Sequence, residues 1–341
     1  MTMQIRAGVI GSSTASARVL AVEGLSTFFK TPSGTVHAVD DVSFELLRGE
    51  LLGIVGESGS GKSTLALSLL RLVPPPGAIV NGKVMLEGRD LLTLSPKQMR
   101  QVRGRDISII FQNPTRSLHF AFTIGWQLIE ALRVHQRATR KDSVQKVFHS
   151  LVTVGISDAE SRMSDYPHQF SGGMQQRVMI ALGLMNDPKI LIADEPTTAL
   201  DVTIQAQILD LLRKLSAERE MAVILVTHNL SVVANICDSM LVMYAGQIVE
   251  EGTVEDVFSE PHHPYTLGLL SSLPERSTGK RLPTILGCPP TTSLDMPSGC
   301  RFEPRCRFAE EICHQKPELT QVSEGRRSRC WVSQRDGFLK T

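Results

Sequence analysis

The sequence has 341 residues, of which 42% are hydrophobic, so it is longer than most compact domains and can form a sizeable core. We therefore expect one large domain with a smaller unit attached to it. The 36 Lys and Arg residues nearly balance the 35 Asp and Glu residues, and this balance argues against a nucleic-acid or acidic partner.

Residues 1–18 lack the continuous apolar stretch of a signal peptide, and we expect them to form a short flexible leader. No apolar run approaches the roughly 18 residues that a membrane-spanning helix needs. We therefore expect a cytoplasmic protein in a reducing compartment, where disulfide bonds between its six cysteines are disfavoured.

Short β-branched runs alternate with helical patterns over residues 19–260, which predicts an α/β domain. The core strands are apolar throughout instead of alternating, as expected for a parallel sheet that is covered on both faces. The strands are predicted at residues 49–55, 106–111, 189–194 and 222–228.

Two further patterns complete the predicted domain. Residues 123–135 and 143–156 are helical in pattern and indicate a helical subdomain at about residues 115–185, inserted between the second and third core strands. Residues 239–252 have the pattern of a β-hairpin with Ala245 and Gly246 at its turn.

The composition changes after residue 260. Prolines multiply, the periodicity fades and cysteines gather. We therefore expect residues 261–341 to form a small, irregular C-terminal extension.

The segment GESGSGKST, residues 56–64, follows a predicted strand and precedes a predicted helix, as the phosphate-binding P-loop requires. Its glycines allow backbone N–H groups to surround a triphosphate, and the helix start adds a positive dipole end. Lys62 would reach the β- and γ-phosphates, and the Ser63 hydroxyl would bind Mg²⁺. The residues predicted to bind ATP here are Gly56, Ser58, Gly59, Ser60, Gly61, Lys62, Ser63 and Thr64.

Asp194 and Glu195 stand at the end of the third predicted core strand. Beside a P-loop, Asp194 would bind magnesium and Glu195 would polarise the attacking water. The alternative is an acidic pair that merely caps the next helix.

The segment FSGGMQQ places Ser171, Gly172 and Gly173 at the start of a strongly helical stretch, which makes a second possible anion-binding helix start. One nucleotide cannot easily occupy two such sites within a single subunit. We therefore expect each nucleotide to lie between this segment of one subunit and the P-loop of another.

With these motifs in order, residues 19–260 resemble the nucleotide-binding subunits of ABC transporters. The resemblance implies a P-loop ATPase core with inserted helical and antiparallel β subdomains, in which ATP drives dimerisation. It implies that Gln112 couples magnesium and water to the membrane partner, that Asp201 belongs to the D-loop, and that His228 contacts the γ-phosphate. The expected catalytic residues are thus Lys62, Gln112, Glu195 and His228.

The signature segment of that family would act on ATP bound by the partner subunit. Its residues here are Ser171, Gly172, Gly173, Met174 and Gln175. Met174 and the preceding Phe170 depart from the commoner LSGGQ, and Asn229 stands where Asp is more frequent. For His228, the alternative is a buried histidine at a strand end.

The resemblance also implies an aromatic ring that stacks on adenine, ahead of the second strand. Phe29 is our candidate for this ring, and Phe28 is the other. Either side chain could instead belong to the core.

Two segments, residues 171–181 and 262–274, resemble the peptide and nickel importer ATPases within the family. This implies import of short peptides or related small solutes at the cytoplasmic side of the bacterial inner membrane. The implied partners are a second, different ATPase subunit, two membrane permeases that residues 113–125 would face, and a periplasmic or extracellular solute-binding protein. The alternatives are a soluble ABC ATPase of translation or DNA repair, and a redox-regulated ATPase.

Four cysteines of the extension form a possible metal site: Cys300, Cys306, Cys313 and Cys330. Four thiolates can bind Zn²⁺ or an iron–sulfur cluster, and gaps wider than those of zinc knuckles favour the cluster. The subfamily resemblance also implies a [4Fe–4S] site; zinc, or thiols without a ligand, are the alternatives.

Neighbouring residues bear on this site. Arg301, Arg305 and Arg307 would offset the negative charge of a thiolate-ligated cluster, and Cys288 could compete as a ligand. We expect Cys306→Ser to loosen the extension and to leave the nucleotide affinity of the core mostly unchanged.

Overall fold

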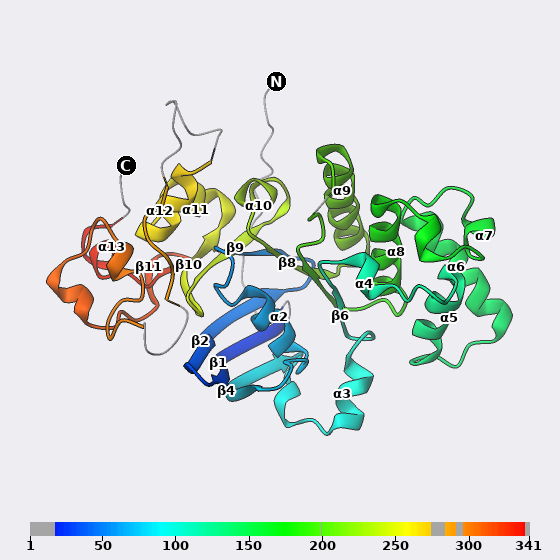
Figure 1. Cartoon of the computed structure of the whole chain (residues 1–341), viewed down its shortest axis with the longest axis horizontal. Helices are drawn as coiled ribbons and strands as arrows, with labels where there is room; N and C mark the ends of the chain where they lie inside the picture. The colour runs from blue at the N-terminus through cyan, green and yellow to red at the C-terminus, as the bar shows by residue number, and fades with distance from the viewer. Residues whose placement is uncertain (1–17, 199, 274–283, 291–295, 338–341) are drawn as a thin grey trace.

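The computed structural model describes residues 18–198, 200–273, 284–290 and 296–337. Apart from Arg18, the leader expected over residues 1–18 lies outside this part of the chain. Figure 1 shows a helical part at one end of the molecule and the C-terminal extension at the other, with two sheets between them. The larger sheet has eight strands in the order β11-β12-β10-β9-β3-β8-β7-β6.

The parallel part of this sheet confirms the four predicted core strands. Strands β9, β3, β8, β7 and β6 pair in parallel. Because the carboxyl ends of parallel strands meet at one edge of a sheet, the segments that follow these strands come together there. The strands are β3 (Leu51–Val55), β6 (Ile107–Ile110), β7 (Ile190–Asp194), β8 (Ala222–Thr227) and β9 (Ser239–Tyr244).

Both faces of the parallel sheet are buried, which explains the uninterrupted apolar runs. In β8, Ile224 and Val226 belong to a core shared with the smaller sheet. Val223 and Leu225 point the other way, into a core shared with the helices. Burial on both sides therefore leaves the strand ends as the place for polar chemistry.

The smaller sheet is antiparallel, as the resemblance implies, and has the order β2-β1-β4-β5. Leu65 and Leu69 of the helix after the P-loop share its core. Its strands are β1 (Arg18–Thr31), β2 (Gly34–Leu47), β4 (Gly77–Leu86) and β5 (Arg89–Asp90). The helices beside it are α2 (Lys62–Leu69), η1 (Leu91–Thr93) and α3 (Pro96–Val102).

The helical part lies between β6 and β7 in the chain, where sequence analysis places it. Thr123 and Thr139 accept backbone hydrogen bonds at the starts of the two predicted helices, α5 and α6, and so fix where these begin. The elements are α4 (Pro114–Ser117), α5 (Ile124–Arg133), α6 (Arg140–Thr153), α7 (Ala159–Arg162), η2 (Pro167–Gln169) and α8 (Gly172–Leu184).

The predicted hairpin is confirmed as β9 and β10 (Gln247–Thr253). Ala245 and Gly246 form its turn with φ of 45° and 85°, the pair of positive φ angles that a tight hairpin requires. Helices α9 (Val202–Arg219) and α10 (Leu230–Ile236) join the neighbouring strands.

The extension continues the large sheet instead of standing apart from it. Strand β12 (Arg326–Ser328) pairs with β10, with Ser328 opposite Glu250 and Arg327 opposite Glu251. The β-ladder thus crosses the boundary expected between residues 260 and 261. The other elements are α11 (Val254–Ser259), α12 (Pro264–Ser271), η4 (Glu303–Arg305), η5 (Glu311–His314), β11 (Thr320–Ser323) and α13 (Trp331–Asp336).

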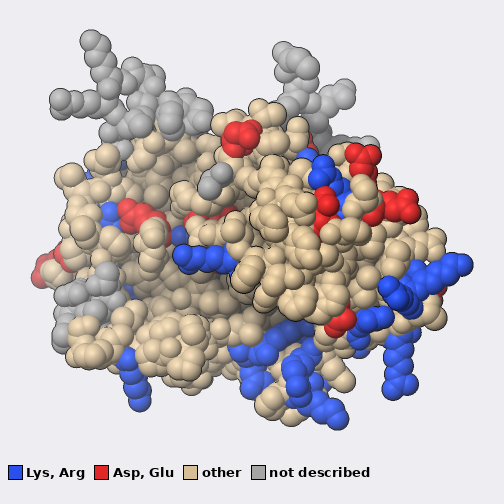
Figure 2. Space-filling view, turned by 45° about the vertical axis from the view of Figure 1, so that its right-hand side comes forward, with Lys and Arg blue, Asp and Glu red and all other residues tan. Residues whose placement is uncertain are grey.

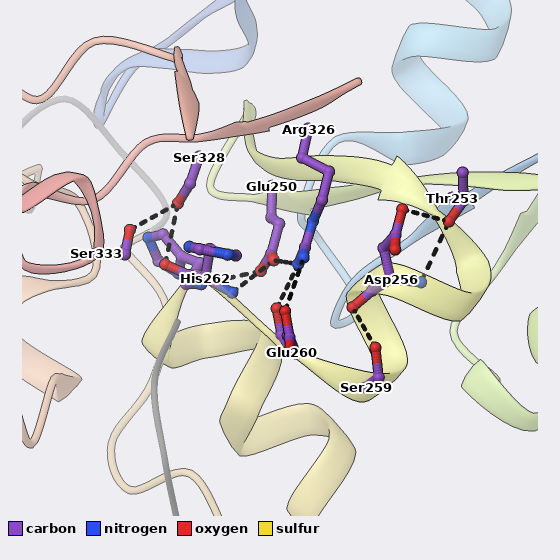
Figure 3. A network of polar contacts seen from close by, with 10 residues as sticks. Glu250, Thr253, Asp256, Ser259, Glu260, His262, Arg326, Ser328 and Ser333 are labelled. Atoms are coloured by element: carbon purple, nitrogen blue, oxygen red, sulfur yellow. Dashed lines mark hydrogen bonds and ion pairs between the residues drawn. The ribbon is translucent and has the colours of Figure 1, made fainter. Parts of the chain in front are cut away.

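Glu250 of β10 is the buried polar centre of this junction (Figure 3). Its carboxylate accepts from the backbone N–H groups of His262 at 2.6 Å and His263 at 2.9 Å. Arg326 of β12 lies 3.7 Å from the same carboxylate. One side chain of the core therefore binds both the start of α12 and the last strand of the extension.

The charges, which nearly cancel over the chain, are unevenly spread on its surface. Figure 2 shows Lys and Arg side chains along the lower edge of one face, with Asp and Glu side chains gathered mainly above them. Among the described residues, no helix is both long enough and apolar enough to cross a membrane.

Candidate active site

The P-loop joins β3 to α2 in a turn that requires glycine at two positions. Gly56 has φ 153° and Gly61 has φ 102°. A Cβ atom on Gly56 would collide with the carbonyl oxygen of Met243, and one on Gly61 with that of Ala38. Neighbouring backbone therefore packs directly on the P-loop and determines its path.

Lys62 lies buried at the first position of α2, inside this loop. Its Nζ donates to the carbonyl oxygens of Gly56 at 2.8 Å and Glu57 at 2.9 Å, and lies 3.4 Å from the Ser60 hydroxyl. Burial lowers the pKa of Lys62, and the nearby Glu195 carboxylate opposes that shift. The ammonium group thus lies where the triphosphate is predicted to bind.

The two predicted magnesium ligands Ser63 and Asp194 are neighbours in space. The Ser63 hydroxyl donates to Oδ1 of Asp194 at 3.1 Å. Burial raises the pKa of Asp194, and this hydrogen bond acts in the opposite direction. Hydroxyl and carboxylate oxygens are the ligands that Mg²⁺ prefers, so the pair fits this ion.

Glu195 is the centre of the predicted catalytic group. Oε2 accepts from Nε2 of Gln112 at 2.6 Å and from the hydroxyl of Thr198 at 2.8 Å, while Nδ1 of His228 lies 2.8 Å from Oε1. Burial alone would raise the pKa of Glu195, but the hydrogen bonds from His228 and Thr198 outweigh it and the pKa is lowered. The carboxylate is therefore ionised and fixed in place.

Sequence analysis predicted the other members of this group and missed Thr198. No separate motif marks this threonine, because its role depends on the turn that brings it back to Glu195 three residues earlier.

A pocket of about 430 Å³ lies at these residues. Asp194 and His228 are not among its lining residues in the described part of the chain, but they reach it through their hydrogen bonds to Ser63 and Glu195. The predicted residues that line it are Ser58, Gly59, Gly61, Lys62, Ser63, Thr64, Gln112 and Glu195.

The aromatic ring at this pocket belongs to His37, which sequence analysis did not single out. Phe28 stacks on it with ring centroids 4.0 Å apart. The Phe29 ring lies beside Gly77 of β4, and Phe29 is not among the described residues that line the pocket. Pro290 and Met296 of the extension also line the pocket.

The signature segment starts α8 but does not line this pocket in the described part of the chain. Ser171 caps the helix by accepting from the Met174 N–H at 3.4 Å, and Ser171 and Gly172 are exposed. Gly173 is close to Ile204, because a Cβ atom there would lie 2.8 Å from that side chain.

Gln175, unlike Ser171 and Gly172, is buried and hydrogen-bonded within the helical part. Its side chain is buried, and Nε2 donates to the carbonyl oxygens of Pro167 at 2.9 Å and Phe170 at 3.2 Å. Its Oε1 accepts from the Thr115 hydroxyl at 3.2 Å, which ties α8 to the segment after Gln112. Asp201, the predicted D-loop residue, caps α9 by accepting from the Ile204 N–H at 2.9 Å.

The structure brings the four predicted cysteines of the extension around one small pocket: Cys300, Cys306, Cys313 and Cys330. Burial raises the pKa of the Cys300 thiol to about 11 and that of Cys306 to about 12. In the described part of the chain, no three His, Cys, Asp or Glu side chains are grouped so that they could hold one metal ion. The exposed Cys288 does not line this pocket.

Two family models match the chain. The model described as ABC transporter matches residues 39–198, which include the P-loop, Asp194, Glu195 and the signature segment. The model described as the C-terminal region of oligopeptide and dipeptide transporters matches residues 249–313, which include α12 and three of the four clustered cysteines.

Individual proteins agree with these matches. The chain is 49% identical over 314 residues to the dipeptide transport ATP-binding protein DppD of Haemophilus influenzae, covering 92% of this chain and 94% of that protein. It is also 49% identical over 319 residues to a Brucella abortus protein named as a candidate peptide import ATP-binding protein, covering 93% and 96%.

Two solved structures share the fold of the core. The dimeric ATP-binding cassette MJ0796 with bound ADP and phosphate has a TM-score of 0.62 and 26% identity, and the match covers 69% of this chain and 98% of that one. The structure of cbiO1 from Clostridium perfringens has a TM-score of 0.61 and 28% identity, covering 72% and 92%.

Proposed function

This chain belongs to the ATP-binding proteins of ABC transporters, and on that premise we propose that it hydrolyses ATP to drive the import of short peptides or related small solutes. The observation that carries the proposal is the assembly of Lys62, Gln112, Glu195 and His228 beside one P-loop pocket. The match of the C-terminal region and the names of two relatives support the peptide class.

A second subunit completes the site in this proposal. Ser171 and Gly172 stand exposed at the start of α8, where the helix dipole favours an anion. The dimeric MJ0796 structure with ADP and phosphate supports such a shared site. The second subunit is a different ATPase of the same family, as the sequence resemblance implies.

The residues present can perform the hydrolysis. Lys62 lies at the phosphate position, and Glu195 polarises the attacking water while Gln112 and His228 hold its carboxylate. Ser63 and Asp194 would hold Mg²⁺, which neutralises charge on the phosphates. Loss of the γ-phosphate removes a link between the subunits and lets the dimer open.

The chain also needs a membrane partner, and one surface of the helical part fits a permease. Phe120 is 75% exposed and Trp126 is 46% exposed, and Phe122 stacks on Trp126 with ring centroids 4.0 Å apart. Exposed aromatic side chains that lie close together are typical of protein interfaces. This surface follows Gln112 in the chain, so docking can be sensed at the catalytic group.

In this proposal the chain lies at the cytoplasmic side of the bacterial inner membrane, bound to two permeases that receive solute from an external binding protein. The test is to purify the complex and to measure ATP hydrolysis and peptide uptake in vesicles. Lys62→Ala should abolish both activities while the complex still assembles. Uptake that continues in this variant, or a wild-type chain without permease subunits, would contradict the proposal.

For the extension, the proposal includes a [4Fe–4S] cluster held by Cys300, Cys306, Cys313 and Cys330. The convergence of four thiols on one pocket supports it, because this is the donor set of such a cluster. Zinc is the alternative ligand, because four thiolates can also bind this ion. Bound there, the cluster would supply a structural cross-link.

Iron and acid-labile sulfide, measured after purification without oxygen, test the cluster. We expect iron in the wild-type chain, a loss in Cys306→Ser, and an unchanged amount in the control Cys288→Ser, whose thiol is exposed and outside the pocket. Zinc in place of iron, or no metal at all, would contradict the cluster.

A further inference from the structure

Glu57, the second residue of the P-loop, is bound by the extension and by the catalytic lysine at the same time. Its N–H donates to the hydroxyl of Tyr265 in α12 at 2.7 Å. Its carboxylate accepts two hydrogen bonds from Arg305, at 2.7 Å and 3.0 Å. Its carbonyl oxygen accepts from Lys62 Nζ at 2.9 Å. Glu57 is thus the residue that lies between the extension and the Lys62 ammonium group, which would bind the phosphates.

Arg305 is held firmly in this position. Its side chain is only 4% exposed, and Nε donates to the carbonyl oxygen of Leu286 at 2.9 Å. The guanidinium also lies over the rings of Tyr244, 5.6 Å from the centroid, and Phe302, 5.9 Å from the centroid. A guanidinium with this many fixed contacts transmits a displacement of its backbone to Glu57.

The backbone of Arg305 belongs to the cysteine loop. It lies in the single turn η4 between Cys300 and Cys306, whose N–H donates to the Glu303 carbonyl at 3.1 Å. The Cys300 N–H donates to the carbonyl oxygen of Cys313 at 2.9 Å, so the cysteine segments also brace one another. The position of η4 therefore depends on how the thiols pack in their shared pocket.

The Arg305–Glu57 ion pair is explained less well by stabilisation of the contact between extension and core than by a role in positioning the P-loop. The Arg305 side chain is only 4% exposed and that of Glu57 is 29% exposed, so the pair gives up much of its hydration and adds little net stability compared with apolar packing. A carboxylate in the P-loop also repels the phosphates unless a cation offsets it. Arg305 both offsets that charge and holds the backbone whose carbonyl binds Lys62.

We propose that the loop carrying Cys300 and Cys306 positions the P-loop through Arg305, so that disturbing the clustered thiols weakens ATP binding at the core. The inference rests on the proposed nucleotide site, and it does not depend on which ligand the thiols hold. It changes the expectation that Cys306→Ser leaves nucleotide affinity mostly intact. Arg305 is a positioning residue, since it acts through Glu57.

The first test measures the dissociation constant of a fluorescent ATP analogue with Mg²⁺ for the full chain, together with the melting temperature. Arg305→Gln should weaken binding about tenfold, a common size for coupling between two sites. Arg305→Lys should restore part of the affinity, because it keeps the charge but loses the paired hydrogen bonds.

The matched control is Arg327→Gln. Arg327 also joins the extension to the core by a paired contact, with Glu251 of β10, but neither residue is among the described residues that line the nucleotide pocket. It should change the melting temperature and leave ATP affinity unchanged. Equal affinity of the wild type and a folded Arg305→Gln variant would overturn the inference.

The second test links the thiols to Arg305. Cys306→Ser should weaken ATP binding and Cys288→Ser should not, whereas Cys306→Ser should add little in the Arg305→Gln background, because both changes act through one contact. Additive losses, or no effect of Cys306→Ser alone, would refute the link. A wild-type chain that fails to bind the analogue would instead count against the proposed function.

Discussion

Glu195 has a backbone conformation that glutamate rarely adopts. Its φ is 48°, and its N–H donates to the Val226 carbonyl of β8 at 2.8 Å. Strain of this kind persists where surrounding contacts hold a residue in place, as Gln112, Thr198 and His228 do here. The carboxylate is therefore oriented before any nucleotide arrives.

Glu195→Gln should lower ATP hydrolysis at least about a hundredfold, because an amide cannot accept the proton of the attacking water. ATP binding should persist and the dimer should stay closed, which size-exclusion chromatography with ATP can show. Glu220→Gln is a matched control, since Glu220 also has a positive φ, of 49°, but ends α9 away from the pocket. Normal turnover in Glu195→Gln would show that another group activates the water.

Sequence analysis predicted the P-loop residues and the strand-end pair Asp194 and Glu195 because their roles are tied to local backbone form. A P-loop needs its glycines, and a carboxylate at the end of a strand beside the P-loop can bind the magnesium ion of the nucleotide. The roles of Gln112 and His228, by contrast, came only from the family resemblance. Thr198, His37 and Glu57 were not predicted as site residues, because each gains its role from a contact that the chain makes only after folding. The adenine contact of Phe29 stays a prediction.

At the scale of elements, the junction between β10 and the extension is the part that sequence patterns describe least. Strands β11 and β12 have four and three residues, and the sequences TQVS and RRS lack an apolar alternation. Strand β12 forms by pairing with β10, and β11 forms by pairing with β12 in turn; neither pairing is encoded by an apolar pattern of their own residues. The apolar strands of the parallel sheet, by contrast, were all predicted.

The stability of this junction should depend on pH through Glu250. Burial raises the pKa of Glu250 to about 7 from 4.5, although the N–H groups of His262 and His263 favour the carboxylate. A raised pKa means that the folded state binds the proton more tightly. The stabilising contribution of Glu250 to the free energy of unfolding is therefore complete below pH 4.5 and is lost as the pH rises through about 7.

Glu250→Gln should remove this part of the pH dependence, which amounts to roughly 3 kcal/mol at most in the free energy of unfolding. Urea unfolding between pH 5 and about 8 measures it. Glu251→Gln, one residue further along β10, is the control and should keep the slope. The same slope in Glu250→Gln would assign the pH dependence to another group.

At the scale of the whole molecule, the helical part and the extension lie at opposite ends of one sheet (Figure 1). The nucleotide pocket receives residues from the P-loop, from the segment after β6, and from the extension through Met296. Contacts at both ends can therefore reach the same pocket.

The helical end should carry the permease contact. Phe120→Ala should weaken permease binding about tenfold, the size expected for an aromatic interface residue, and leave ATP affinity unchanged. Val134→Ala is the control, because Val134 is also exposed, at 71%, but stands at the far end of α5. The amount of permease that co-purifies with each variant measures its permease binding. If Phe120→Ala recovers as much permease as the wild type, the contact lies elsewhere.

The pairing of β12 with β10 has a practical consequence for anyone who shortens this protein. A truncated chain that stops near residue 260, where the composition changes, would lack β12, the strand that pairs with one side of β10. Glu250, which is buried in the full chain, would then be exposed. An unpaired edge strand can pair with strands of other molecules, so such a fragment should aggregate instead of behaving as an independent domain. Trimming studies should therefore retain residues through 328.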